Sequence, residues 1–218
     1  MIPAPMIPGL SRRRLLQTAT AAAAVLPFVA PGTAYAGTSI QRDTLEAFAD
    51  TVVPGAKRFA GDRVVAGATA GPGAVDAGAW ALYNDPDVGI AVALPGLVAA
   101  INTEATGYAL THRILLDVRV PPFVALDFAG RTAVVGLLLR GTGVVQLLWY
   151  ATAAMAMLAF HTAGHLDTAA AVRAGHPGLA WLGFPQPGPD GIWRFPDFSY
   201  QQELAPLHPR TTSTGNPE

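Results

Sequence analysis

The sequence of 218 residues lacks cysteine altogether. This absence excludes disulfides, thiolate nucleophiles and cysteine-ligated metal clusters from this chain. Serine is scarce as well, and none of the four serines lies in the Gly-x-Ser-x-Gly turn that carries many hydrolase nucleophiles. A phosphate-binding P-loop and a His-Glu-x-x-His zinc motif are also missing. The sequence therefore predicts no catalytic residue from a known short motif.

Charged residues are few, at 13% of the chain, where a soluble monomer usually has about 25%. The net charge is −1 and the mean hydropathy is +0.34, so no basic patch marks a nucleic-acid binder. A chain with so little charge either buries an unusual share of its surface against a partner or contacts a membrane.

Residues 1–36 have the organisation of an export signal. A basic start is followed by a short Ala-rich apolar stretch and by Ala34-Tyr35-Ala36, an A-x-A cleavage site. The basic start matches the twin-arginine pattern through Ser11, Arg12, Arg13, Leu15 and Leu16. We therefore expect the twin-arginine translocase to export the chain across the cytoplasmic membrane and Gly37 to begin the mature protein. An ordinary secretory signal and a permanent N-terminal anchor are the alternatives.

Apolar residues at helical spacing predict an all-α fold, a compact domain of about five helices. We expect the domain to cover residues 37–210 and Thr211–Glu218 to form a loose tail. We expect Ser39 or Asp43 to cap the first helix, and Asp127 to pair with Arg131. The expected helices are about Leu45–Val53, Ala74–Tyr83, Leu94–Leu116, Leu126–Leu139 and Val144–Phe160.

The last of these helices is apolar all round. Such a helix is either buried in the core or spans a membrane, and 144–160 is at the lower limit of length for a span. The core position is the favoured interpretation.

Residues 174–210 are rich in Gly and Pro, which predicts an irregular strap. Aromatic residues are crowded into it, whereas disordered tails are poor in them. The strap is therefore expected to be ordered, and its aromatic side chains are the predicted partner-binding residues: Trp181, Phe184, Trp193, Phe195, Phe198 and Tyr200.

Three histidines are candidates for chemistry. His161 and His165 have the i, i+4 spacing that places two imidazoles on one helical face, as in divalent metal sites. The alternative, which we favour, is a polar helix end with a histidine near the helix dipole. His112 lies on an apolar stripe and is interpreted as a core histidine, with His112 and His161 as weaker candidates for an acid or base.

Three segments resemble the gluconate 2-dehydrogenase subunit 3 family. Leu45–Ala56, LEAFADTVVPGA, is similar to the family's first helix and the turn after it, and follows a twin-arginine leader. Leu126–Leu139 is similar to its middle helix, and Leu179–Gly188, LAWLGFPQPG, to its C-terminal element.

This resemblance implies a role without catalysis. Such small subunits escort a large flavoprotein of the glucose–methanol–choline type through twin-arginine export and stabilise it. FAD would be bound by that partner and no cofactor by this chain, and a cytochrome subunit is a further expected partner. The alternative is a stand-alone exported enzyme or binding protein for an apolar small molecule, with a pocket lined by Tyr108, His112, Trp149 and Tyr150.

Overall fold

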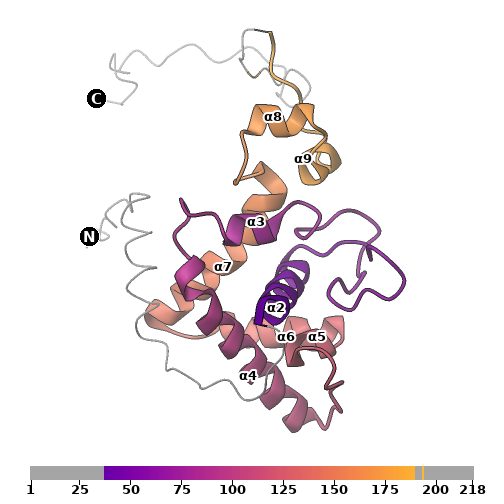
Figure 1. Ribbon diagram of the computed structural model, residues 1–218, viewed down its shortest axis with the longest axis vertical. Coiled ribbons are helices and arrows are strands. Elements are labelled where there is room, and N and C mark those ends of the chain that lie inside the picture. Colours follow the sequence, from indigo (N-terminus) through magenta and orange to yellow (C-terminus); the bar gives the residue numbers. More distant parts are fainter. Residues whose placement is uncertain (1–36, 190–192, 194–218) are drawn as a thin grey trace, which may run out of the picture. The chain divides into compact units, whose positions relative to one another are not determined.

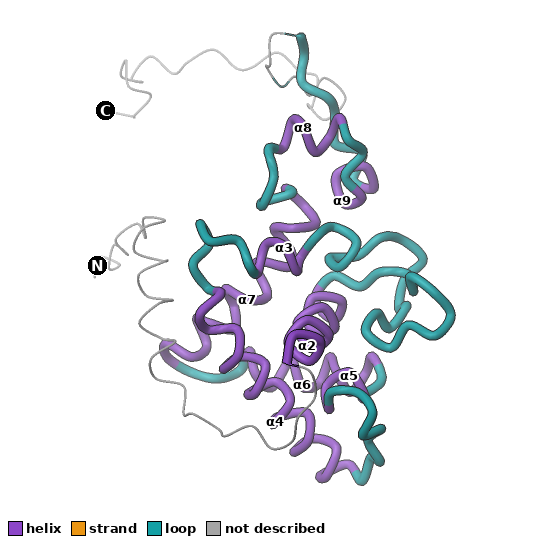
Figure 2. Tube along the Cα trace, viewed as in Figure 1, coloured by secondary structure: helices purple, strands orange, loops and turns teal. Residues whose placement is uncertain are grey.

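The computed structural model describes residues 37–189 and Trp193 (Figure 1). The chain divides into two compact units, Met1–Phe184 and Pro185–Glu218. The leader residues Ser11, Arg12, Arg13, Leu15, Leu16, Ala34 and Ala36 lie outside the described residues, as does the tail 211–218. Within the described part all regular structure is helical, which confirms the all-α prediction (Figure 2).

All five predicted helices are present, although the second begins at Ala79 instead of Ala74 and the third ends at His112 instead of Leu116. Three further short α-helices accompany them within the described residues. A 3₁₀ turn, Ala91–Ala93, leads directly into α4. The α-helices are α2 (Gly37–Val52), α3 (Ala79–Tyr83), α4 (Leu94–His112), α5 (Pro122–Ala125), α6 (Phe128–Leu139), α7 (Gly143–Thr162), α8 (Thr168–Arg173) and α9 (Pro177–Trp181).

Helix α2 begins well before its apolar stripe, so the predicted cap was wrong: Ser39 and Asp43 lie inside the helix. Polar residues can extend a helix wherever they face solvent, and here Arg42 donates to Glu46 one turn later, at 2.7 Å. The helix ends at Val52 because Pro54 restricts the residue before it to extended backbone.

Helix α2 is the centre of the core. It packs against α3, α4, α5, α6 and α7, and Figure 1 shows it end-on among them. Its Leu45 and Phe48 are fully buried, with Leu97 and Ile101 of α4 beside them in one cluster. The Phe48 ring lies 6.3 Å from the Trp149 ring of α7. Burial of side chains of this size is worth about 1.5–3 kcal/mol each, so this cluster holds the helices together.

Only one side of helix α7 is buried in the core. Leu148, Thr152 and Ala156 are buried, and α7 packs on α2, α3, α6 and α9. By length and composition alone it could cross a membrane, but only 39% of its most apolar window is buried inside the protein. Core helices of soluble proteins pass the same test. The structure thus places one side of α7 in the core, as expected, and leaves apolar residues exposed on the other.

The start of the predicted irregular strap is more regular than expected, because α9 forms within it. Gly175, at φ 73°, follows the end of α8, and Pro177 occupies the first turn of α9. The Gly and Pro residues that predicted an irregular segment here mark the end of one helix and the start of the next. Asp167 caps α8 through the Ala170 N–H (2.7 Å), and the His176 ring accepts from the Leu179 N–H (3.4 Å).

Candidate functional site

The 54–78 loop, between α2 and α3, is attached to the core by the buried Asp50 carboxylate. Its Oδ1 accepts the Gly55 N–H at 3.1 Å and its Oδ2 accepts the Ala66 N–H at 2.8 Å. Burial raises the pKa of Asp50, and these two hydrogen bonds oppose that rise. The Asp of the ADTVVPGA segment therefore shapes a loop.

Two glycines let the loop's ends pass each other. A Cβ added to Gly73 would lie 2.5 Å from the Gly55 nitrogen, and one added to Gly55 would lie 2.6 Å from the Gly73 nitrogen. The approach is held by backbone hydrogen bonds from Ala56 N to Gly71 O (2.7 Å) and from Ala74 N to Val53 O (3.0 Å). Only glycine fits at these two crossing points.

Arg131 of α6 fixes the middle of the same loop. The guanidinium is buried and donates to the carbonyls of Arg63 (2.5 Å) and Val64 (2.6 Å) in the loop. It also donates to the carbonyls of Val124 (2.7 Å) and Leu126 (3.1 Å). Burial lowers the pKa of Arg131, and the negative charge of Asp50 opposes this effect.

The predicted Asp127–Arg131 ion pair is not what these residues form. Asp127 caps α6 and accepts the Gly130 N–H at 2.8 Å. Arg131 instead points to four carbonyl groups, because its position on α6 faces the core. The i, i+4 spacing of Asp127 and Arg131 therefore does not produce an ion pair: Asp127 caps the helix, and Arg131 holds the loop.

An ion-pair network supports the loop's other side. Asp62 is buried, accepts the N–H groups of Val64 (3.0 Å) and Val65 (3.1 Å), and binds Arg58 at 2.6 Å. Arg58 also reaches Glu46 of α2 at 2.9 Å. Burial alone would raise the pKa of Asp62, but Arg58 and the two N–H donors lower it below its usual value.

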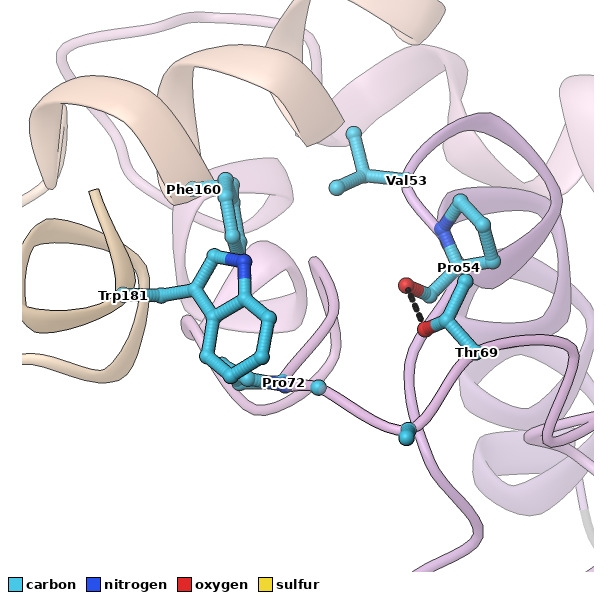
Figure 3. Close-up of a pocket in the computed structure, with 8 residues that line it drawn as sticks. Val53, Pro54, Thr69, Pro72, Phe160 and Trp181 are labelled. Carbon is cyan, nitrogen blue, oxygen red and sulfur yellow. Dashed lines mark hydrogen bonds between the residues drawn. The ribbon is translucent and has the colours of Figure 1, made fainter.

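The loop forms one wall of an apolar pocket of about 350 Å³. Figure 3 shows Phe160 of α7 and Trp181 of α9 on one side and Val53, Pro54 and Thr69 on the other. The Thr69 hydroxyl donates to the Pro54 carbonyl (2.9 Å), so it is already satisfied. Trp181 is 64% exposed and lies against Gly71. The full lining is Val53, Pro54, Thr69, Ala70, Gly71, Pro72, Phe160 and Trp181.

The outer side of α7 is an exposed apolar face, here called the α7 face. The whole helix contains no Asp, Glu, Lys or Arg. Large side chains of this face are 40–50% exposed, and Phe160 near the same helix end lines the pocket. Aromatic residues and Met without charge are typical of protein interface cores. The α7 face consists of Val144, Leu147, Tyr150, Met157 and Leu158.

Comparison with known proteins places the chain in one family. Residues 39–218 match a family of unknown function, DUF5987. The chain belongs to this family. No curated protein and no solved structure matches it. The family match begins inside α2, at its third residue, and covers the other described helices completely.

In this DUF5987 member His161 and His165 do not share a helical face. Helix α7 ends at Thr162, and Ala163 adopts φ 50°, which turns the chain away before His165. His161 is exposed in the last turn, with its ring nitrogen 2.8 Å from the Met157 carbonyl, as the favoured alternative of a polar helix end predicted. No group of three metal-ligating side chains is formed within the described residues.

His112 is not a core histidine, and this interpretation was wrong. It is exposed at the end of α4, stacks on Tyr108 with ring centroids 4.0 Å apart, and bonds the Tyr108 carbonyl at 2.9 Å. Trp149 lies in the core, whereas Tyr150 is exposed on α7. The pocket of Figure 3 has a different lining from the one predicted with these residues.

Two imidazoles, the candidate His165 and His176, which the sequence analysis did not single out, connect the chain around α8 to the end of the 54–78 loop. The His176 ring lies 3.1 Å from the Ala77 carbonyl, and His165 packs directly on Gly78, whose φ is 84°. The rings are 6.3 Å apart, and His165 Nδ1 is buried without a hydrogen-bond partner among the described residues. Burial lowers the pKa of His165, and so does His176. The sequence signal that could have indicated His176 is its position directly before Pro177, which starts α9.

The predicted partner-binding residues divide between described and undescribed positions. Trp181 is exposed at the pocket, and Phe184 is half-buried against the small cluster of Ala163, Ala171 and Leu179. Trp193 is described, in the second unit. Phe195, Phe198 and Tyr200 lie outside the described residues.

Proposed function

We propose that this chain is a non-catalytic small subunit of an exported FAD-dependent dehydrogenase of the glucose–methanol–choline type. It would escort that flavoprotein through twin-arginine export and stabilise it afterwards. The observation that carries the proposal is the charge-free α7 face, which lies next to a pocket suited to an apolar side chain.

The energetics favour a partner that uses both features. Full burial of a large apolar side chain is worth about 1.5–3 kcal/mol, so half-exposed residues gain roughly half of that. The five residues of the α7 face would then supply about 4–8 kcal/mol, while association itself costs an estimated 4–15 kcal/mol. A side chain of the partner inserted beside Trp181 would supply the additional anchor, as hot-spot residues do in pockets.

The leader and the sequence resemblance support the direction of the escort. A twin-arginine leader is read on folded cargo, and a flavoprotein must fold to bind FAD. A partner without its own leader could therefore leave the cytoplasm attached to this chain. A cytochrome subunit, if it joins the complex, would bind the flavoprotein after export.

Native purification of the tagged full chain from its own host tests the proposal. We expect a co-eluting protein of flavoprotein size and a visible spectrum with the two flavin bands. The variant Leu147→Ser/Leu158→Ser should lose that protein, and Leu115→Ser, an exposed change elsewhere, should retain it. A colourless chain that elutes alone would contradict the proposal.

The apolar pocket favours a second function, binding of an apolar small molecule by a stand-alone exported protein. Its lining offers carbon surface, with the one hydroxyl of Thr69 already bonded. Titration with an apolar fluorescent probe tests this function. A saturable signal that Trp181→Ala abolishes would support it, and equal uptake by both proteins would contradict it.

A further inference from the structure

The loop between α4 and α5, residues 113–121, carries a second exposed apolar surface. It lies at the end of α4 in Figure 1. Leu115 is 98% exposed, Val118 77%, and Leu110 in the last turn of α4 75%. Ile114 is exposed as well. Single exposed apolar residues are ordinary, but four within nine positions form a patch.

The patch is presented by an ordered turn. The Ile114 N–H bonds the Ala109 carbonyl at 2.8 Å, which closes α4 with a Schellman-type turn. Arg113 takes the left-handed position of this turn at φ 56°, where glycine is usual. Further on, Asp117 accepts the Arg119 N–H at 3.0 Å. Leu115 and Val118 therefore stay exposed because the backbone on both sides of them is fixed.

The charge around the patch is positive. Asp117 is shared between Arg119 (2.8 Å) and Arg63 (3.1 Å), and Arg113 is an exposed residue of the same loop. Three arginines thus accompany one carboxylate, whose pKa the hydrogen bonds from Arg119 and Arg63 hold well below its usual range. The carboxylate therefore stays ionised, and a positive excess remains next to the apolar side chains.

We propose that the 113–121 loop docks on an anionic phospholipid bilayer. Leu115 and Val118 insert below the headgroups while Arg63, Arg113 and Arg119 contact lipid phosphates. Arginine beside protruding apolar residues is the composition of interfacial membrane binders, and each basic residue near an anionic surface strengthens binding. The α7 face differs in both respects, because it is a helix side without any charge.

A lipid surface fits this patch better than a protein partner does. Stable protein interfaces use roughly 20–30 residues a side, with the energy concentrated in central buried anchors. Here only four apolar side chains are available, and the most exposed of them projects from a turn. A bilayer accepts such a small projection because it needs no matching pocket. The inference does not depend on the proposed dehydrogenase partner.

Co-sedimentation of the full chain with vesicles tests the proposal. We expect binding to vesicles of phosphatidylglycerol and phosphatidylcholine, and at least about tenfold weaker binding to phosphatidylcholine alone, since three arginines contribute. Leu115→Ser/Val118→Ser should lower the partition coefficient at least about tenfold on the anionic vesicles. Arg113→Gln/Arg119→Gln should lower it as well and reduce its salt dependence.

The matched control is Val144→Ser/Leu147→Ser on the α7 face, which should bind vesicles as the parent does. All variants retain residues 1–36, so the ratio between variants isolates the loop from any contribution of the leader. Unchanged thermal melting shows that each variant folds. The proposal is overturned if the parent does not bind, if Leu115→Ser/Val118→Ser binds equally well, or if only the α7 control loses binding.

Discussion

The 54–78 loop and the 113–121 loop both use aspartate and arginine side chains, but they use them in opposite ways. In the 54–78 loop Asp62, Arg58 and the clamp Arg131 hold the loop against the core, and Asp62 and Arg131 are buried. In the 113–121 loop Asp117 and Arg119 lie at the surface, and Leu115 projects outward. An aspartate–arginine pair is thus a core anchor in one loop and a surface brace in the other.

The difference between the two loops shows where charged residues contribute to the stability of this chain. A pair in water contributes about 0–1 kcal/mol, whereas breaking a buried pair costs about 3–5 kcal/mol, because the remaining charge is left without a partner. We therefore expect stability to depend on the 54–78 loop. The 113–121 loop can carry exposed apolar residues at little cost to folding, which makes it available for binding.

Arg131→Met should have the largest effect. It leaves the carbonyls of Arg63, Val64, Val124 and Leu126 without their donor, and removes the positive charge near Asp50. We expect a loss of about 3–5 kcal/mol in unfolding free energy, measured by urea denaturation. The matched change Arg119→Met, in the other loop, should leave the unfolding free energy nearly unchanged, because water screens an exposed ion pair. Equal losses for the two variants would remove the contrast between the loops.

Gly73→Ala should come next. The new Cβ would meet backbone atoms of Gly55, which cannot move aside as a flexible side chain does. Forced overpacking of this kind costs about 1–3 kcal/mol. Gly107→Ala is the control, because that helical glycine has open space around it and should gain stability by up to about 1 kcal/mol. Melting temperatures of the two variants should therefore move in opposite directions.

These pairs also show what could be predicted from the sequence. The helices with clear periodicity and the breaks at Pro54 and Gly141–Gly143 could be located, because apolar spacing and breakers are local signals. Short helices such as α9 could not, because a Gly and a Pro at helix ends resemble an irregular segment. The burial of Arg131 depends on contacts between residues 63 and 131, which no local pattern records.

The residues of the candidate surfaces were also predicted only in part. Trp181 was expected at a partner surface, and it is exposed at the pocket. His112 was expected in the core because its helical register matches the apolar stripe of α4. However, α4 ends at His112, so the core no longer covers the stripe at this point, and both His112 and Leu115 are exposed. Periodicity alone does not show where neighbouring helices stop covering a stripe.

Asp62→Asn should give a smaller loss than Arg131→Met, about 1–3 kcal/mol at neutral pH, because Arg58 and two N–H groups lose a charged acceptor. The pKa of Asp62 is lower in the folded protein than the usual value of about 3.9. Its contribution is therefore complete above that value and is lost as the pH falls towards its folded pKa.

The measurement for Asp62 is unfolding free energy between pH 7 and pH 2. The parent should lose stability as the pH falls below about 4, and Asp62→Asn should show a flatter acid limb. Asp50 acts in the opposite direction, because its raised pKa makes its contribution decrease as the pH rises through that range. The Asp50→Asn variant should therefore have a steeper acid limb than the parent, and a flatter one would show that our account of its pKa is wrong.

Arg113→Gly should have the smallest effect on stability and the opposite sign. Arg113 occupies left-handed backbone, which costs an L residue roughly 1–2 kcal/mol and a glycine almost nothing. After the greater entropy of glycine in the unfolded chain is subtracted, we expect a gain of about 0.5–1 kcal/mol. The same variant should bind anionic vesicles less well, because one of three guanidinium groups is lost. A gain in stability together with a loss in binding would show that this loop keeps a strained arginine for its surface role. A variant that is more stable and binds vesicles as before would leave Arg113 without a role at the membrane.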